Sequence, residues 1–292
     1  MAAGTRLRAL LNSQQLVIAP GCYDGATARM VAAQGFSAAY VSGASVAALE
    51  LGQPDLGFAG VAEFLQTLRR VVPALSPVPV IADADTGFGD AVHVAETVHR
   101  YEQAGVAGLH LEDQVMPKRC GHMSGKKLVD RETASARIQA ASRTRENLLV
   151  IARTDALTVE GMDAALARSA AYVDAGADAL FVEGLSSVAE IEQVHRHVGD
   201  VPLVVSLSEA AGPVPLGIDD LRAAGVAIAI VPVAGLLAAL AAFRTVLRNL
   251  AQHGRATPVD QLVWPELTDL LGLPSLIGFE NATQTVGVTT HD

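Results

Sequence analysis

Short apolar runs alternate along the chain with longer stretches in which apolar residues recur every three or four positions. The runs are rich in Val, Ile, Leu and Ala and mostly lack polar alternation, which is typical of parallel strands buried on both faces. The predicted strands are 16–20, 38–42, 78–83, 107–112, 148–154, 179–183, 201–206 and 226–231. The stretches between them have the spacing of amphipathic helices. The predicted helices are 62–72, 91–103, 131–143, 164–175, 188–197, 218–224 and 236–252.

Several of these helices end in a similar three-residue motif. Ala-Gly-Val occurs at 104–106 and 224–226, and Ala-Gly-Ala at 175–177. Each motif puts a glycine where a left-handed residue would end a helix before the next strand. Eight predicted strands that alternate with helices through short returns favour an α/β fold of the (β/α)8 TIM-barrel type over an open doubly wound sheet. The first strand is not followed by a glycine-rich dinucleotide fingerprint, which weakens the second alternative.

The last part of the chain differs in character. It holds Pro258, Pro265 and Pro274, the only tryptophan, Trp264, and then a tail rich in Gly, Thr and Val that is typical of loosely structured chain. We therefore predict a catalytic barrel domain at 1–252 and a C-terminal helical extension at 253–292.

Composition narrows the class of protein. Half of the 292 residues are hydrophobic, enough to bury a large core in one barrel. Acidic residues outnumber basic ones by 31 to 21, which argues against nucleic acid or an anionic membrane as a partner. The most apolar window, 226–240, contains Pro232 and Gly235 and is too short to span a bilayer. The start has no long apolar core like a signal peptide's, and Cys22 and Cys120 lie far apart, so we predict a cytoplasmic protein.

Reactive side chains collect where the predicted strands end, and barrel enzymes carry their active sites at that end. They are Tyr40, Ser42, Gly43 and Ala44 after the second strand, Asp83 and Asp85 after the third, Glu112 and Asp113 after the fourth, Arg153 and Asp155 after the fifth, Glu183 after the sixth, and Ser206 and Ser208 after the seventh. Asp83 and Asp85 share a face if the chain is still extended there. Carboxylates with few histidines suit Mg²⁺ or Mn²⁺ better than zinc. An acid-capped turn has the same pattern.

The other strand-end residues suit an anionic ligand. Arg153 can clamp a carboxylate through two parallel hydrogen bonds, or it can form a salt bridge with Asp155. Tyr40 and residues 42–44 offer a hydroxyl and backbone N–H groups to an anion, or they form an ordinary strand-to-helix turn. Asp55 lies in a loop, where it can simply cap a helix.

A polar loop after the fourth strand holds Lys118, Arg119, Cys120 and His122. Two cations and an imidazole beside a thiol favour its thiolate, because positive charge stabilises the anion. The alternative is an unreactive cysteine, since free cysteines are among the most buried residues. The polar neighbours of Cys120, and the freedom that Gly121 gives the backbone, favour the reactive interpretation.

Six motifs carry a resemblance to a known family. They are Tyr-x-Ser-Gly at 40–43, Pro-Asp-Leu-Gly at 54–57, Asp-Ala-Asp-x-Gly-x-Gly at 83–89, His-x-Glu-Asp-Gln at 110–114, Lys-Arg-Cys-Gly-His at 118–122 and Ala-Arg-Thr-Asp-Ala at 152–156. In this order they resemble the isocitrate lyase and phosphoenolpyruvate mutase superfamily, and within it methylisocitrate lyase, 2,3-dimethylmalate lyase and their relatives. The resemblance extends to about residue 240.

The resemblance implies a metal site and a site for an α-keto acid. The metal is Mg²⁺, bound by the residue matching Asp85, with Asp83 and Glu112 assisting directly or through water. Residues 42–44 and Arg153 hold the α-keto acid moiety. The resemblance also implies a homotetramer, a dimer of dimers, in which the C-terminal extension packs on the barrel or is exchanged as a swapped helix with a neighbouring subunit.

The implied reaction is cleavage of a carbon–carbon bond in a 2-hydroxy di- or tricarboxylic acid, giving an α-keto acid such as pyruvate and a carboxylic acid. Cys120 is the general acid and base. It lies in a flexible loop, flanked by Gly121 and Gly125, that closes over the substrate. Lys118, Arg119 and His122 tune Cys120 and help to bind the second carboxylate. The base that takes the hydroxyl proton is Tyr40 or Asp55.

One departure from the family pattern concerns the substrate. Methylisocitrate lyases read Asn-x-Thr-Glu after the seventh strand, whereas this chain reads Ser206-Leu-Ser208-Glu209. Serine lacks the paired donor and acceptor of an amide, so a substituted malate fits at least as well as a tricarboxylate. We predict that Ser206, Ser208 and Glu183 contact the substrate. The alternatives are oxaloacetate hydrolase or decarboxylase chemistry, a phosphonomutase, and a metabolite-binding barrel without turnover.

Overall fold

The computed structural model describes residues 1–208, 215–256 and 260–284. It divides into two compact units, Met1–Leu237 and Ala238–Asp292. This division by compactness does not test the predicted boundary at residue 252, which stays a prediction.

The first unit is built on eight parallel strands in the order β1-β8-β7-β6-β5-β4-β3-β2. The strands are β1 Val17–Pro20, β2 Ala39–Val41, β3 Val80–Asp83, β4 Gly108–Glu112, β5 Leu149–Thr154, β6 Ala179–Val182, β7 Leu203–Ser206 and β8 Ile228–Val231. Between β1 and β2 the described ladder holds one bridge, Gly21 to Tyr40, beside a hydrogen bond from Cys22 N–H to the Tyr40 carbonyl. The barrel is therefore nearly closed, and the predicted eight-stranded α/β architecture is confirmed.

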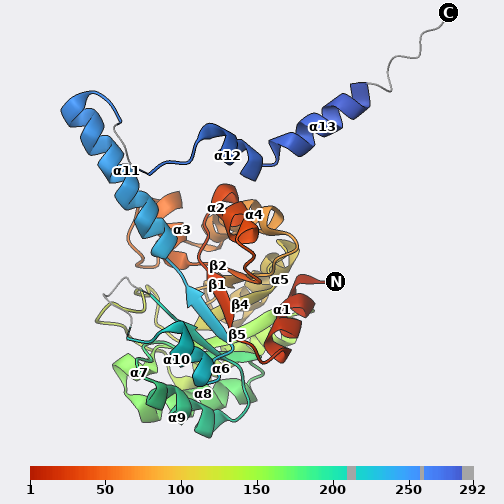
Figure 1. Cartoon of the computed structure of the whole chain (residues 1–292). Coiled ribbons are helices and arrows are strands. Elements are labelled where there is room, and N and C mark those ends of the chain that lie inside the picture. Colours follow the sequence, from red (N-terminus) through yellow and green to blue (C-terminus); the bar gives the residue numbers. More distant parts are fainter. Residues whose placement is uncertain (209–214, 257–259, 285–292) are drawn as a thin grey trace, which may run out of the picture. The chain divides into compact units, whose positions relative to one another are not determined.

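Helices surround the strands (Figure 1). Those of the first unit are α1 Ala3–Asn12, α2 Gly25–Ala33, α3 Gly43–Glu50, α4 Val61–Leu75, α5 Ala91–Gln103, α6 Arg131–Thr144, α7 Ala156–Val159, α8 Met162–Asp174, α9 Val188–Val198 and α10 Ile218–Ala223. Local sequence explains several starts, since Asp24 and Ser187 each accept a backbone N–H from the third helical residue. The predicted glycine caps are confirmed, because Gly105, Gly176 and Gly225 all have positive φ.

Two apolar cores hold the barrel together. One lies inside it and includes Ile81, Leu149, Ile151 and Phe181. The other fills the space between the strands and the surrounding helices. Leu7 of α1 is fully buried in the interior core, so the N-terminal helix packs into the barrel. Both cores leave the carboxyl ends of the strands to polar side chains.

The second unit contains most of α11, Ala234–His253, with α12 Trp264–Leu270 and α13 Leu273–Gln284. Its helices confirm the predicted helical extension, whereas helix exchange between subunits stays a prediction. The apolar window at 226–240 belongs partly to β8 and partly to α11. By length and composition alone α11 could cross a membrane, but one such helix is weak evidence. The predicted loose tail at 285–292 lies outside the described residues.

Candidate active site

The acidic side chains of β3 and β4 meet at the carboxyl end of the barrel. The extended chain that would put Asp83 and Asp85 on one face does not continue to Asp85, because β3 ends at Asp83 and Asp85 has a φ of +45°. Both carboxylates nevertheless converge on Gly43, where an added Cβ would lie 2.8 Å from Asp83 Oδ2 and 3.2 Å from Asp85 Oδ1. Left-handed backbone at a residue other than glycine is sparsely populated and is often found at functional sites.

Asp83 already has two backbone partners. Gly43 N–H donates to Asp83 Oδ2 at 3.0 Å, and Asp85 N–H donates to Asp83 Oδ1 at 2.9 Å. Burial opposes the charge of Asp83, but His110, Lys118 and Arg153 together lower its pKa to about 2. Asp83 thus fixes the start of α3 against β3. The Gly43 amide, which the sequence analysis assigned to an anion, is engaged by this carboxylate.

Lys118 neutralises the acids beside it. Its ammonium lies 2.5 Å from Asp55 Oδ1 and 2.8 Å from Asp85 Oδ1, and its side chain is 2% exposed. Burial opposes that charge, but Asp85, Glu112 and their neighbours raise the pKa of Lys118 well above its usual value. Burial raises the pKa of Asp85 to about 7 despite Lys118. Asp55 therefore belongs to the cluster and is more than a helix cap.

The donors predicted to hold a metal fit a hard cation in their chemistry. In the described part of the chain both oxygens of Glu112 are buried without a hydrogen-bond partner. Carboxylate oxygens of this kind are the ligands that Mg²⁺ prefers. Within residues 1–208, 215–256 and 260–284, however, no three His, Cys, Asp or Glu side chains are grouped closely enough to hold a metal. A cation at Asp85 would have to share that carboxylate with Lys118.

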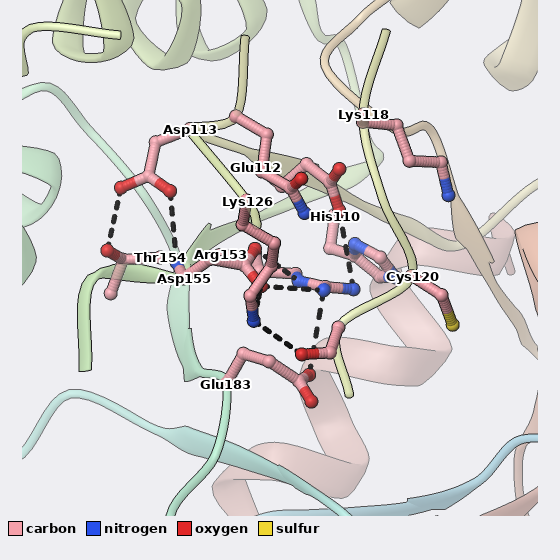
Figure 2. Close-up of polar contacts among 12 residues, drawn as sticks. His110, Glu112, Asp113, Lys118, Cys120, Lys126, Arg153, Thr154, Asp155 and Glu183 are labelled. Atoms are coloured by element: carbon pink, nitrogen blue, oxygen red, sulfur yellow. Dashed lines mark hydrogen bonds and ion pairs between the residues drawn. The ribbon is translucent and has the colours of Figure 1, made fainter. Parts of the chain in front are cut away.

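Arg153 leaves β5 with its guanidinium buried among acids. It donates to Asp155 through Nε and Nη2, both at 3.1 Å, and lies 3.4 Å from Glu112 and 3.7 Å from Glu183. Burial raises the pKa of Glu183, whose carboxylate faces Arg153 in Figure 2. The salt bridge to Asp155, one of the two alternatives for Arg153, is present. Its role as a carboxylate clamp stays a prediction.

The loop that carries Cys120 is folded over these residues. The Gln114 side chain binds both the N–H and the carbonyl of Arg119, at 2.9 and 2.8 Å. Cys120 N–H donates to the Asp55 carbonyl at 3.2 Å. An added Cβ on Gly121 would lie 2.6 Å from the Glu183 carboxyl carbon and 2.7 Å from Arg153 Nη2. The loop is thus in direct contact with the floor of the site.

The environment of Cys120 reverses one expectation. Burial, with the charge of Asp55, raises the pKa of the Cys120 thiol to about 12, so the thiolate is disfavoured. The cations that were expected to lower it are occupied elsewhere. Lys118 pairs with Asp55 and Asp85, and the exposed Arg119 side chain donates to the Ser124 carbonyl. His122 Nδ1 lies 3.4 Å from Sγ. A protonated thiol is suited to donate a proton.

Tyr40 and His110 form a buried pair across β2 and β4. Tyr40 Oη lies 2.6 Å from His110 Nε2, and the rings stack. Burial, with Asp83, raises the pKa of Tyr40 well above its usual value, and burial lowers that of His110 to about 4. Both groups are therefore neutral near pH 7. Ser42 and Ala44 lie nearby at the start of α3.

A cavity of about 640 Å³ opens beside this cluster, between the loop and the ends of β6 and β7. Its lining includes Gly121, His122, Glu183, Ser206 and Ser208, all of them predicted site residues, together with Lys126, Val159, Leu185 and Val205. Glu209, the last residue of the motif at 206–209 that differs from the methylisocitrate lyase pattern, lies outside the described residues. The predicted residues therefore divide into a packed charged cluster and the wall of an adjoining cavity.

Several residues of the site were not predicted from the sequence. They are His110, Gln114 and Lys126, whereas Asp113 and Asp155 were predicted only as acidic residues at strand ends. Asp113 accepts from Thr154 Oγ1 at 2.7 Å and Asp155 N–H at 3.0 Å. His110 and Gln114 could have been found from their place in the motif at 110–114, whereas Lys126 lies outside the six motifs. Strand ends gather polar residues of both catalytic and supporting kinds, so position alone does not separate the two.

Comparisons with known proteins agree on one family. A family model described as phosphoenolpyruvate phosphomutase matches residues 7–251. The chain is 41% identical to a 2-methylisocitrate lyase of Aeropyrum pernix over 274 residues, covering 92% of this chain and 87% of that protein. It is 40% identical to a 2,3-dimethylmalate lyase of Eubacterium barkeri over 282 residues, covering 94% and 96%. Relatives that cover most of the chain are thus carbon–carbon lyases.

Solved structures extend the likeness to hydrolases. An oxaloacetate acetylhydrolase in complex with 3,3-difluorooxalacetate superposes with a TM-score of 0.91 at 36% identity, covering 97% of both chains. A phosphonopyruvate hydrolase in complex with oxalate and Mg²⁺ superposes with a TM-score of 0.85 at 31% identity, covering 96% of this chain and 99% of that one.

Proposed function

The chain belongs to the phosphoenolpyruvate mutase/isocitrate lyase superfamily, and from this membership we propose that it is a Mg²⁺-dependent carbon–carbon lyase. Its substrate is a 2-hydroxy acid of the 2,3-dimethylmalate or 2-methylisocitrate type. The products are an α-keto acid, pyruvate for either substrate, and a carboxylic acid.

The observation that carries the proposal is the arrangement of the loop over the charged cluster. Gly121 lies against Arg153 and Glu183, and its neighbour Cys120 is held at Asp55 as a protonated thiol. A proton donor fixed beside a carboxylate-binding cluster is of use to an enzyme that forms a carbanion, and of no use to a binding protein.

In this proposal Arg153 and the start of α3 bind the keto-acid half of the substrate. The guanidinium is buried and already oriented by Asp155, so it loses little freedom on binding a carboxylate. Asp85, with Glu112 and Asp83 in support, would hold Mg²⁺, which supplies Lewis-acid polarisation of the substrate hydroxyl and carboxylate oxygens when bound.

The bond-breaking step is a retro-aldol cleavage. A base removes the hydroxyl proton, the oxygen forms the keto group, and the electrons of the carbon–carbon bond pass to the carbon beside the second carboxylate. Cys120 then donates its proton to that carbon. The closed loop excludes water from the carbanion until this transfer is complete.

Asp55 is the better base of the two candidates. Tyr40 is buried with a raised pKa, and its hydrogen-bonded partner His110 has a lowered one, so neither takes up a proton readily at neutral pH. Asp55 is a carboxylate paired with Lys118 and lies beside the Cys120 backbone. We therefore expect Asp55→Asn to lower kcat far more than Tyr40→Phe.

The described cavity lining favours a dicarboxylate. Among these residues Lys126 is the one fixed cation, and it is paired with Asp155 at 2.8 Å. Val159, Val182, Leu185 and Val205 make part of the wall apolar. A methyl group suits such a wall, whereas a third carboxylate would be desolvated there without a free cation. This supports 2,3-dimethylmalate over 2-methylisocitrate.

The test is a coupled keto-acid assay with Mg²⁺ that offers 2,3-dimethylmalate, 2-methylisocitrate, isocitrate and oxaloacetate side by side. We expect pyruvate from the first two, with the dicarboxylate preferred. The Cys120→Ser variant should lose turnover and keep most of its ligand affinity. Full turnover by this variant would contradict the proposal.

A second candidate is hydrolysis of oxaloacetate, which is favoured by the similarity to the acetylhydrolase structure. Formation of oxalate and acetate from oxaloacetate, without pyruvate from either hydroxy acid, would assign the chain to this branch instead.

We further propose that the chain forms a tetramer by exchanging C-terminal helices. In the single chain Leu240, Phe243, Leu247 and Leu250 of α11 are each more than 40% exposed, and their spacing places them along one stripe of the helix. Light scattering on a size-exclusion column tests this, and a monomer at micromolar concentration would contradict it.

A further inference from the structure

Lys126 is a buried charged residue that the proposed mechanism does not use. It lies at the end of the loop that carries Cys120, and its side chain is 3% exposed. Its ammonium lies 2.8 Å from Asp155 Oδ1 and donates a second hydrogen bond to the Gly121 carbonyl. Figure 2 shows the side chain extending toward Asp155 and Glu183. A lysine buried in this way needs both partners, because an unpaired buried charge is costly.

The two partners belong to different parts of the site. Asp155 is fully buried and follows β5 directly. Its N–H donates to Asp113 Oδ1 at 3.0 Å, and its carboxylate accepts two hydrogen bonds from Arg153. Asp155 is therefore fixed to the barrel. Gly121, by contrast, lies in the loop, one residue after Cys120.

Cys120 is tethered on both sides. On one side, Gln114 holds the N–H and carbonyl of Arg119. On the other, Lys126 holds the carbonyl of Gly121. The space at Gly121 is too small for a Cβ, so a shift of this peptide would move Cys120 away from the acidic cluster.

We propose that Lys126 is a positioning residue, which ties the Gly121 carbonyl to Asp155 and thereby holds the Cys120 thiol in place to donate its proton. The catalytic part of this inference rests on the proposed lyase function. Because Asp155 also orients Arg153, the same carboxylate links the position of the loop to the group that binds the keto acid. Lys126 also borders the cavity, so direct binding of a substrate carboxylate is the competing role.

The first test uses no substrate. Lys126→Met removes the tie and leaves Asp155 paired with Arg153, so the barrel should still fold, as a thermal unfolding curve would verify. Lys127→Met is the matched control, because it removes the same charge at an exposed neighbour. The rate of Cys120 alkylation by iodoacetamide reports the position of the loop, and buried Cys22 serves as the internal reference.

We expect alkylation of Cys120 to accelerate about tenfold or more in Lys126→Met, the effect of losing a charge-assisted hydrogen bond. The rate should stay near that of the unmodified protein in Lys127→Met, and Lys126→Arg should restore most of the protection. Equal rates of Cys120 alkylation in Lys126→Met and Lys127→Met would refute the proposed link between Gly121 and Asp155, whatever reaction the protein catalyses.

The second test separates positioning from substrate binding. With the best substrate of the panel, a positioning role predicts a fall of about tenfold or more in kcat with little change in KM, because the thiol acts in the bond-breaking steps. Ethylammonium added to Lys126→Ala should restore part of kcat. A raised KM with unchanged kcat would assign Lys126 to the substrate and overturn the proposal. If no panel substrate reacts, the lyase function fails while the alkylation result still decides whether the tie exists.

Discussion

The close contact of Gly121 with the floor of the site makes Gly121→Ala a direct test of loop closure. The new Cβ would lie 2.6 Å from the Glu183 carboxyl carbon and 2.7 Å from Arg153 Nη2, well inside van der Waals contact. Both groups end flexible side chains, but Arg153 is held by Asp155 and Glu112. The loop therefore has to rise, because the floor cannot easily move.

The free-energy cost of closing the loop in Gly121→Ala can be estimated from the effect of overpacking in other proteins. An extra methyl group in a well-packed site typically costs about 1–3 kcal/mol, and each factor of ten in an equilibrium corresponds to about 1.4 kcal/mol. The closed loop should thus become about 5-fold to 150-fold less populated. The barrel core does not include Gly121, so the unfolding temperature should hardly change.

The assay compares kcat and unfolding temperature in Gly121→Ala with those in Gly25→Ala, where an added Cβ has no neighbour closer than 3.9 Å. We expect kcat to fall at Gly121 only, and Cys120 alkylation to accelerate in parallel. An unchanged kcat together with an unchanged alkylation rate would refute the reasoning, because it would mean that the closed loop either tolerates the methyl group or is not required.

Three further predictions follow from the same cluster. Lys118→Met leaves Asp55 and Asp85 without their shared cation. It should lower the free energy of unfolding, measured by urea titration, by about 3–5 kcal/mol, and added Mg²⁺ should restore part of this loss. A variant that is as stable as the unmodified protein without Mg²⁺ would argue against the pairing. The pKa of Cys120 is raised from 9.0 to about 12, so the neutral thiol stabilises the folded protein fully below pH 9.0, and this contribution is lost as the pH rises toward 12. The rate of Cys120 alkylation should therefore still increase above pH 9.0. A rate that stops increasing below pH 9.0 would contradict the raised pKa. Ser206→Asn combined with Ser208→Thr supplies an amide and a longer hydroxyl side chain to the cavity and should shift the kcat/KM ratio toward 2-methylisocitrate by about tenfold, whereas an unchanged ratio would place discrimination elsewhere.

The strand–helix alternation could be predicted from the sequence because each strand is an uninterrupted apolar run. The predicted strand at 148–154 and the observed β5 Leu149–Thr154 differ by one residue, and the predicted helix at 91–103 coincides with α5. The bounds of helices α1, α2 and α3 were not predicted. These helices are short, and α3 consists largely of small residues with buried positions around much of its surface, so it lacks the one-sided spacing of an amphipathic helix.

The candidate site could be predicted in composition but not in geometry. Strand ends indicated Asp83, Asp85, Glu112 and Arg153, because the fold brings all carboxyl ends to one side. The turn at Asp85 and the high pKa of Cys120 could not be predicted in this way. Both depend on how tightly a loop packs against distant residues, and charge patterns along the chain carry no information on burial. The pairing of Lys126 with Asp155 was missed for the same reason.

The division of the site between strands has an evolutionary consequence. The charged cluster is contributed by β3, β4, β5 and the loop above them, whereas β6 and β7 supply much of the cavity wall. Wall residues other than Glu183 and Lys126 can be substituted without disturbing the ion pairs that fix Lys118 and Arg153. A duplicated gene could therefore drift toward new acids by exchanging Ser206, Ser208 or Leu185 while it inherits an intact bond-breaking apparatus.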